Sequence, residues 1–319
     1  MKILEYNEVD SLQVLNLTLL ALDFPLTPEY AAHIRRTDPR LFPCLTLNAV
    51  ENDEVVGVVG ILRLPMISTE GREDVGGVWA VSTHPHHAGR GVASALLEEA
   101  HARMRDAGLR FSMLLTERHL KAYKLYHQHG YVEMNVWAKA LARWEVAHQP
   151  TRLRTQPASA ILSESKGQDG YDSVDKIFEE ISKHYLGFAW RHKPFIRLRD
   201  KMSLDDIWIV RENNMPVGYI YARKEGLLLE THIHLLHPDT DIVEAIAVIA
   251  SKLKAPYVQV GMSRPSHIAS LKRARWQVTH PNWASFMVKP LIPEVTAEDA
   301  RRLFGIGTDR FLISWLDVT

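Results

Sequence analysis

Apolar and polar residues alternate along the chain in blocks that favour helices and then strands. Apolar residues recur at helical spacing over residues 4–24, and Thr27 followed by Pro28 indicates the start of a second helix. Residues 44–64 contain two runs of β-forming residues joined by the sequence ENDE, which is typical of a hairpin. The pattern therefore predicts two helices, a hairpin and, over residues 75–85, a further strand.

An amphipathic helix is predicted next, over residues 91–108. Its apolar face is formed by residues spaced at one helical turn, namely Val92, Leu96, Ala100 and Met104. A strand over 109–117, a short helix over 119–130 and a final strand over 131–141 follow. These elements make the first half a mixture of strands and helices around one sheet.

The second half repeats the order of the first. The corresponding segments are a helical region over 173–200, a hairpin over 207–226, a strand over 227–238, a helix over 241–255, a strand over 257–262, a helix over 265–278 and a strand over 283–291. The strands predicted over 75–85 and 227–238 both end with the sequence His-Pro. An internal duplication is therefore predicted. The tail, 296–319, adds a helix and an apolar strand that we expect at a sheet edge.

Between the halves lies a stretch rich in turn-forming residues and without a clear period. It contains Pro150, Pro157, Gly167 and Gly170, and we place the boundary near residue 150. A chain of 319 residues is long enough for two domains. The prediction is an α/β protein with mixed sheets and two tandem domains, 1–150 and 151–319.

Composition narrows the classes of function. Lys plus Arg and Asp plus Glu are equal at 38 each, so net charge gives no reason to expect nucleic acid or an anionic membrane as a partner. Cys44 is the one cysteine, which excludes an intramolecular disulfide and is expected to be a small buried residue. No targeting segment or membrane-spanning run is visible, so we expect a cytoplasmic protein.

A glycine turn joins the strand 75–85 to the helix 91–108. The first N–H groups of a helix have no partner inside the helix, and the helix dipole adds partial positive charge there. Gly89 and Gly91 let the backbone turn its amides toward a ligand, and Arg90 adds a charge. The arrangement suits a phosphate or pyrophosphate, although it fits neither the P-loop nor the dinucleotide fingerprint.

Two motifs in this order resemble the GCN5-related N-acetyltransferase (GNAT) superfamily. That family has a strand ending near Pro, then Arg/Gln-x-x-Gly-x-Gly/Ala opening a long helix, and later a helix ending LYxxxGF/Y. The matching residues are Pro85, Ala88, Gly89, Arg90, Gly91, Val92 and Ala93, followed by Leu125, Tyr126, Gly130 and Tyr131. The resemblance covers about residues 50–140. Ala88 departs from the family's usual Arg or Gln, and His119 from a common Asn.

The resemblance implies that acetyl-CoA lies in a V-shaped gap between the strand segments 78–83 and 110–117. Backbone groups near Val81 and Thr83 would bind the pantetheine arm, and the amides of the glycine turn would hold the pyrophosphate. The implied cofactor-binding residues are Val81, Ser82, Thr83, Ala88, Gly89, Arg90, Gly91, Val92, Ala93 and Ser94.

The chemistry implied by the resemblance is attack of an amine on a thioester carbonyl. A backbone N–H near Val81 would stabilise the oxyanion. The hydroxyl of Tyr126 would protonate the leaving thiolate, with Tyr123 as a weaker substitute. Candidates for the base, by position only, are Glu117, Asp74, Glu73 and His84. None of the four is singled out.

The histidines do not form a metal-ligand pattern. His84, His86 and His87 surround Pro85 in a turn, with no cysteine or acidic residue nearby to complete a set. A second group, with slightly better spacing, consists of His232, His234 and His237. No metal is predicted at either group.

The second half has lost the features of the first. At the position of the glycine turn, Asp239 and Asp241 put negative charge where a pyrophosphate would sit. Lys272 and Arg275 stand at the positions assigned to the tyrosine and the glycine of the later motif. The second half is therefore expected to be a degenerate GNAT-like domain that packs against the first and walls the acceptor site.

These features together predict an N-acetyltransferase that moves an acetyl group from acetyl-CoA to a primary amine by direct attack in a ternary complex. A small-molecule amine is favoured as the acceptor because a second domain tends to close the cleft. A non-catalytic module that binds acyl-CoA is the alternative. A longer acyl group and a homodimer are left open.

Overall fold

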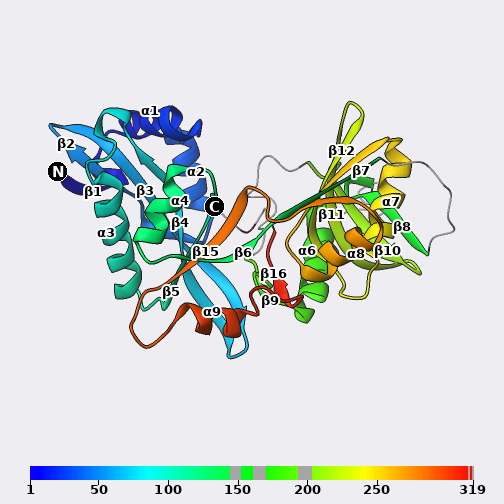
Figure 1. Cartoon of the computed structure of the whole chain (residues 1–319). Helices are drawn as coiled ribbons and strands as arrows, with labels where there is room; N and C mark the ends of the chain where they lie inside the picture. The colour runs from blue at the N-terminus through cyan, green and yellow to red at the C-terminus, as the bar shows by residue number, and fades with distance from the viewer. Residues whose placement is uncertain (144–151, 161–169, 193–202, 315–316, 318–319) are drawn as a thin grey trace.

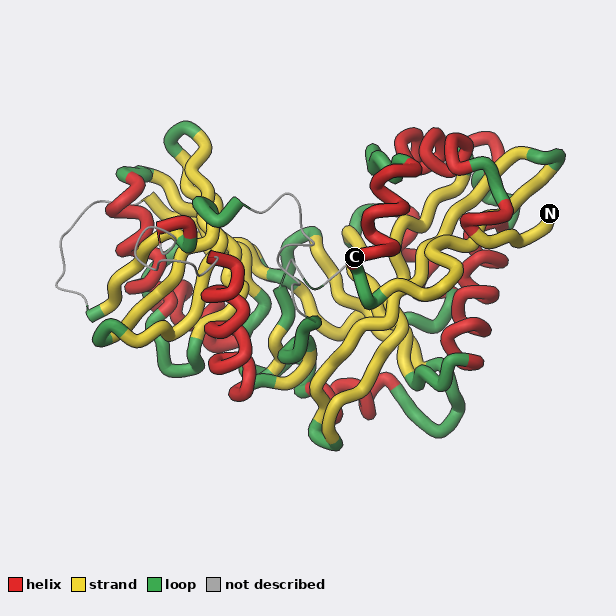
Figure 2. Tube along the Cα trace, turned by 180° about the vertical axis from the view of Figure 1, so that it is seen from behind, coloured by secondary structure: helices red, strands yellow, loops and turns green. Residues whose placement is uncertain are grey.

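The computed structural model describes residues 1–143, 152–160, 170–192, 203–314 and 317. The chain forms two lobes, each a sheet with helices packed against it (Figures 1 and 2). The prediction of an α/β protein with two mixed sheets is thereby confirmed. Within the described residues no helix is long and apolar enough to cross a membrane.

The larger sheet belongs mostly to the N-terminal half. Its strands in chain order are β1 (Lys2–Glu5), β2 (Leu41–Glu51), β3 (Glu54–Ser68), β4 (Gly71–Thr83), β5 (Phe111–Glu117), β6 (Val132–Val136), β9 (Leu186–Gly187), β15 (Ala284–Pro290) and β16 (Phe311–Leu312). The spatial order is β1-β2-β3-β4-β5-β15-β6, with β9 on β3 and β16 on β9. Only β4 and β5 in the main path run parallel, and the others are antiparallel.

Helices cover both faces of this sheet. They are α1 (Ser11–Leu22), α2 (Pro28–Thr37), α3 (Val92–Asp106), α4 (Lys121–Gln128) and α9 (Ala297–Phe304). One core lies between the sheet and α3 and α4, with Leu96, Ala100 and Met104 buried in it as the helical spacing predicts. A second lies under α1 and α2, and a third under α9.

The smaller sheet belongs mostly to the C-terminal half. Its strands are β7 (Ala138–Arg143), β8 (Leu153–Pro157), β10 (Ile207–Glu212), β11 (Met215–Glu225), β12 (Leu228–Leu236), β13 (Tyr257–Met262) and β14 (Gln277–Thr279), in the spatial order β14-β7-β13-β12-β11-β10-β8. The helices packed on it are α6 (Gly170–Ile181), α7 (Ile242–Leu253) and α8 (Pro265–Arg273). Read from the β8 edge, the strands follow the same order as those of the larger sheet read from the β1 edge, with β7 in the place of β15. This correspondence supports the predicted duplication.

The two sheets exchange one strand. β7 pairs with β13 and β14 in the smaller sheet, while β15 pairs with β5 and β6 in the larger one. Figure 1 shows β7 in the right-hand lobe and β15 in the left-hand lobe. The single strand predicted over 131–141 is wrong, because it divides into β6 and β7 and these join different sheets. β7 and β15, which come from segments equivalent in sequence, thus lie in each other's sheets.

Other predicted elements need smaller corrections. Residues 4–24 begin with the edge strand β1 and a 3₁₀ turn before α1 starts at Ser11. In the helical region predicted over 173–200, α6 ends at Ile181, a 3₁₀ turn over Ser182–His184 follows, and β9 then pairs with β16. Residues 193–200 of this prediction lie outside the described residues. The apolar strand of the tail is β16 and lies at the sheet edge, as expected. The domain boundary near residue 150 lies outside the described residues.

A buried hydrogen-bonded chain ties α3 to the sheet. The Nε2 atom of His101 lies 2.9 Å from the hydroxyl of Tyr131, which lies 2.6 Å from the hydroxyl of Ser112. Burial and the charge of Lys289 lower the pKa of His101 to about 3. His101 is therefore neutral in the folded protein at any pH above that value.

Replacing His101 by glutamine is expected to reduce the loss of stability in acid. Because the unfolded chain protonates this histidine near pH 6.5 and the folded chain does not, stability falls as the pH drops from about 6.5 towards 3. The slope from one such group is at most about 1.4 kcal/mol per pH unit. Urea denaturation of wild type and His101→Gln between pH 7 and pH 4.5 measures it. His119→Gln, at a side chain that is 68% exposed, is the control and should leave the slope unchanged.

Candidate active site

The parallel strands β4 and β5 separate after a short contact. They pair only at Gly76 with Ser112 and at Gly77 with Met113. Beyond these pairs β4 carries a bulge, because Gly60 of β3 pairs with Trp79 whereas Val58 pairs with Ser82. Ala80, inside the bulge, has a φ of 51°. A gap thus opens between residues 78–83 and 114–117, and the bulge redirects backbone groups beside it.

The glycine turn at the end of β4 leaves backbone amides without partners. A 3₁₀ turn, Pro85–His87, leads to Gly89 and Gly91, which have φ values of 77° and 81°. Gly91 is the N-cap of α3 and supplies no side-chain cap. Among the described residues, none accepts a hydrogen bond from the N–H groups of Gly89, Gly91, Val92, Ala93 and Ser94. Unpaired amides at a helix N-terminus form an anion-binding site.

Arg90 is engaged by side chains of the protein itself. Its Nη2 atom lies 3.0 Å from Oε2 of Glu51, and its Nη1 atom lies 2.8 Å from Nδ1 of His87. His87 also lies 3.3 Å from the same carboxylate. The charge of Arg90 is therefore partly balanced, and the amides are the turn's main donors for an anion.

The predicted cofactor-binding residues fall into two groups. Val81, Ser82 and Thr83 lie at the end of β4, and the residues from Ala88 to Ser94 surround the turn. The side chains of Ser82 and Val92 are buried in the protein, the former with its hydroxyl on the carbonyl of Ala80. These two residues therefore present only backbone groups, and the assignment of both groups to a cofactor stays a prediction.

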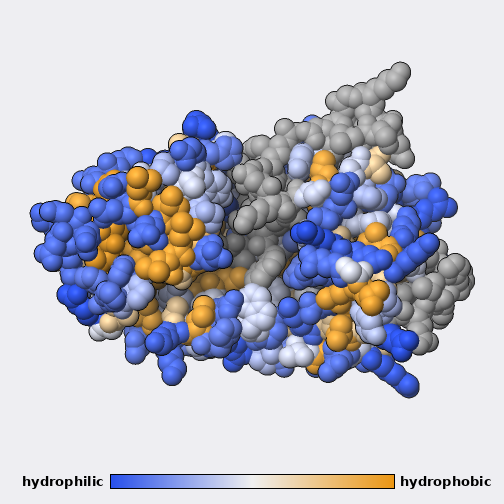
Figure 3. Space-filling view, turned by 90° about the horizontal axis from the view of Figure 1, so that it is seen from above, coloured by the Kyte–Doolittle hydropathy of each residue, from blue (hydrophilic) through white to orange (hydrophobic). Residues whose placement is uncertain are grey.

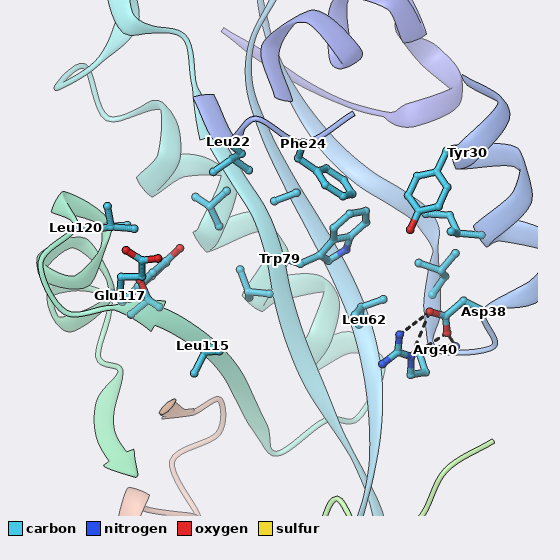
Figure 4. Close-up of a pocket in the computed structure, with 18 of the residues that line it drawn as sticks. Leu22, Phe24, Tyr30, Asp38, Arg40, Leu62, Trp79, Leu115, Glu117 and Leu120 are labelled. Carbon is cyan, nitrogen blue, oxygen red and sulfur yellow. Dashed lines mark hydrogen bonds and ion pairs between the residues drawn. The ribbon is translucent and has the colours of Figure 1, made fainter. Parts of the chain in front are cut away.

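A cavity of about 600 Å³ opens between β4, β5 and the helices above them (Figure 4). On the β5 side its lining includes Leu115, Thr116, Glu117, Leu120, Ala122 and Tyr126. On the opposite side it includes Leu22, Phe24, Tyr30, Ile34, Asp38 and Arg40, with Trp79 between the two sides. Trp283, which precedes β15, also lines it. The second half of the chain thus contributes to the cavity through the exchanged strand.

Tyr126 lies in α4 with its ring packed edge-on to Tyr131, and it borders the cavity. Burial raises the pKa of its hydroxyl, so the phenol stays protonated at neutral pH. Tyr123 is turned elsewhere, because its hydroxyl donates to Glu133 at 2.9 Å, outside the cavity lining. The geometry favours Tyr126 over Tyr123 as a proton donor.

Of the four base candidates, Glu117 alone lines the cavity. Glu73 receives two hydrogen bonds of 2.7 Å from Arg110, and Asp74 lies between Arg63 and Arg72 near the other end of β4. His84 accepts a hydrogen bond from the amide of His86 in the turn. Glu73, Asp74 and His84 do not line the cavity, so Glu117 is the candidate that the cavity favours.

The histidine groups and Cys44 were the candidates for metal binding and thiol chemistry. In the described part of the chain, no group of three or more His, Cys, Asp or Glu side chains is arranged to hold a metal ion. Cys44 is buried, and burial raises the pKa of its thiol to about 11. A thiol in that state is a packing group at neutral pH.

In the second half the helix that corresponds to α3 is α7, and the side chain of Asp241 caps its N-terminus. The Oδ1 atom of Asp241 accepts hydrogen bonds of 2.8 and 3.1 Å from the amides of Val243 and Glu244 at the start of α7. β12 and β13 remain paired over five residues, from Leu228 to His232. The hydroxyl of Tyr185 then joins the end of β12 to Arg264, just after β13. Among the described residues, Asp241 thus occupies two amides at the start of α7, and β12 and β13 stay paired for three residues more than β4 and β5.

The alignment of the later motif needs one correction. The amide of Tyr131 donates to the carbonyl of Tyr126, and the amide of Trp276 donates in the same way to Leu271. Arg275 has a φ of 63° and Gly130 has a φ of 83°, so both residues have the left-handed conformation and occupy equivalent positions. Leu271, fully buried, therefore stands at the tyrosine position instead of Lys272. The second half has no hydroxyl there.

Comparisons with known proteins agree with this geometry. A family model for an acetyltransferase (GNAT) domain matches residues 2–134. No curated protein matches the chain. Among solved structures, a conserved protein from Enterococcus faecalis V583 is 14% identical, with a TM-score of 0.67 over 91% of this chain and 72% of that chain.

Two GCN5-related N-acetyltransferases are similar in the same way. The structure from Anabaena variabilis is 16% identical, with a TM-score of 0.62 over 91% of this chain and 73% of that chain. The one from Sphaerobacter thermophilus is 11% identical, with a TM-score of 0.53 over 92% of this chain and 96% of that chain. At these identities the likeness shows a shared fold across both halves. The N-terminal domain of this chain, over residues 2–134, belongs to the GNAT acetyltransferase family.

Proposed function

We propose that the N-terminal domain transfers an acetyl group from acetyl-CoA to the primary amine of a small molecule, within a ternary complex. The observation that carries the proposal is the separation of β4 from β5 beside a helix N-terminus whose amides are unpaired. The thioester arm would lie in the gap along Val81–Thr83, and the diphosphate would accept hydrogen bonds from the turn between Ala88 and Ser94.

In the proposed reaction the amine nitrogen attacks the thioester carbonyl. A C–N bond forms, the C–S bond breaks, and the thiolate takes a proton from the hydroxyl of Tyr126. The nitrogen loses one proton as the amide forms. Glu117, which lines the cavity, would take this proton through water and return it to the Tyr126 phenolate. The products are an amide and CoA.

Thiol release from acetyl-CoA in the presence of primary amines tests the proposal, with mass spectrometry of the acetylated amine as confirmation. Calorimetry measures acetyl-CoA binding in parallel. Binding without release for any amine would favour the alternative, a non-catalytic acyl-CoA-binding module, which Ala88 in place of the family's Arg or Gln keeps open. Absence of both binding and release would contradict both functions.

Replacing Gly91 by alanine is expected to weaken acetyl-CoA binding about tenfold or more. At a φ of 81° a side chain strains the backbone, and relief of that strain turns the amides away from the ligand. Gly108→Ala is a matched control, because Gly108 has a φ of 77°, also has open space where a Cβ atom would lie, and stands beyond the other end of α3. Both variants should lose similar stability, about 1–2 kcal/mol, and Gly91→Ala alone should lose affinity in calorimetry. Equal affinity in the two variants would contradict the role of the turn.

A further inference from the structure

The cavity continues past Trp79 into a space walled by apolar side chains of α1 and α2. The ring of Phe24 stands edge-on to Trp79 at 5.9 Å and to Tyr30 at 6.2 Å. Leu22, which is 45% exposed, lies at the edge of this space (Figure 4). Figure 3, which looks down on α1, shows a hydrophobic area over the N-terminal lobe. We call this space the aromatic side of the cavity.

Three charged side chains line the cavity among the residues that the structure describes, and two of them neutralise each other. Arg40 donates to Asp38 through Nε at 2.9 Å and through Nη2 at 2.6 Å, and both side chains are almost fully buried. Glu117 lies across the cavity from this pair, as Figure 4 shows. Its described contact is with His119, 3.1 Å away, a group that is charged only when protonated. The lining thus offers one carboxylate that is not matched by a permanent cation.

This charge pattern selects among amines. An acceptor with several ammonium groups would place charges against apolar walls or near Arg40, and a desolvated charge without a partner is strongly unfavourable. An acceptor with one ammonium group and an apolar body would place its body on the aromatic side and its nitrogen towards Glu117. Aromatic rings stack favourably edge to face with Trp79 and Phe24.

Resting on the proposed function, we propose that the acceptor is a monoamine with an aromatic or similarly apolar body, of the arylalkylamine class. Its ring would pack against Trp79 and Phe24, and its amine would approach the thioester from the side of Glu117. Polyamines and aminoglycosides fit this lining poorly, because Glu117 is the one carboxylate among its described residues without a permanent cation beside it.

Gly60 sets the position of the indole ring that forms this wall. A Cβ atom at Gly60 would lie 2.1 Å from Nε1 of Trp79 and 2.2 Å from its Cε2. The ring therefore rests on the backbone of β3, and the absence of a side chain at position 60 leaves room for it. Any larger residue at position 60 would displace the indole ring, and the ring would move into the cavity because Trp79 lines it.

A panel of amines tests the acceptor class on the full chain. With 2-phenylethylamine, spermidine and kanamycin as probes, kcat/KM for thiol release is expected to be on the order of 100-fold higher for 2-phenylethylamine. A preference for spermidine or kanamycin would overturn the acceptor class while leaving the acetyltransferase function intact. No release with any amine, despite acetyl-CoA binding, would overturn both.

Gly60→Ala gives a second test, based on acceptor size. The displaced indole should raise KM for 2-phenylethylamine about tenfold and leave KM for ethylamine within about threefold. Gly76→Ala is the matched control, since its Cβ would meet Sδ of Met104 at 2.4 Å in the core under α3, away from the cavity lining. It should lose a similar amount of thermal stability with no change in the ratio of the two KM values. An equal rise of KM for both amines in Gly60→Ala would overturn the assignment of the aromatic side to the acceptor.

Discussion

Tyr126→Phe is expected to lower the rate of thiol release at least about 100-fold, in the range typical of a lost general acid. The variant keeps the ring that packs on Tyr131 and removes only the hydroxyl. Among the described residues no group hydrogen-bonds to this hydroxyl, so its loss leaves no buried donor or acceptor unpaired. Acetyl-CoA affinity and thermal stability should therefore remain close to those of wild type.

Tyr123→Phe is the control for this variant. The two tyrosines share one helix, but the hydroxyl of Tyr123 donates to Glu133 outside the cavity. Its removal should change the rate less than about threefold. A full rate in Tyr126→Phe would assign the proton donor to another group. Since burial raises the pKa of Tyr126, wild type should also show no alkaline loss of activity from this group between pH 7 and pH 9.

The second large effect is expected when the chain is divided. Residues 1–150 expressed alone should not fold, because β15, the strand between β5 and β6, comes from the other half. Phe286, Met287 and Val288 of that strand are fully buried in the N-terminal lobe. Burying such side chains contributes about 1.5–3 kcal/mol each, and a domain's whole stability is about 5–15 kcal/mol. Near-ultraviolet circular dichroism and urea denaturation of the fragment measure the outcome.

Co-expression of residues 1–150 with residues 151–319 provides the control. Both exchanged strands are then present, and the two fragments should co-purify with acetyl-CoA affinity close to that of the intact chain. A cooperative unfolding transition in the isolated first fragment would show that β15 is dispensable. The same reasoning applies to residues 151–319, which lack β7, the strand between β13 and β14.

The elements of the N-terminal half were largely predictable because their signals are local. The hydrophobic spacing of α3 and the positive φ of Gly89, Gly91 and Gly130 all follow from short-range preferences. The glycine turn and Tyr126 were also predictable, because each belongs to a short sequence motif. What these residues bind stays a prediction.

The strand exchange was not predictable from the sequence. A period of two identifies a strand but says nothing about its partner, so β6 and β7 looked like one element. The duplication offered a signal in retrospect, because β7 and β15 come from the equivalent segments 135–141 and 283–291 and can therefore occupy the same place in either sheet.

The lining of the cavity was also missed. Phe24, Asp38, Trp79 and Trp283 come from four separate parts of the chain, and each has an ordinary local explanation as a core, loop or strand residue. Only the fold brings them together. It also reduces the four base candidates to Glu117, which the sequence could not do because it gave positions along strands and not distances from the gap.

The contrast between α3 and α7 has a consequence for how such a protein changes over time. α7 begins with Asp241, whose side chain satisfies two amides, while α3 begins with Gly91, which satisfies none. An aspartate at the N-cap contributes about 1 kcal/mol relative to alanine but only a few tenths of a kcal/mol relative to glycine. At the φ of 81° that Gly91 adopts, a side chain would also strain the backbone by about 1–2 kcal/mol. The start of α3 therefore does not acquire the cap of α7 by one substitution, because its backbone conformation has to change as well.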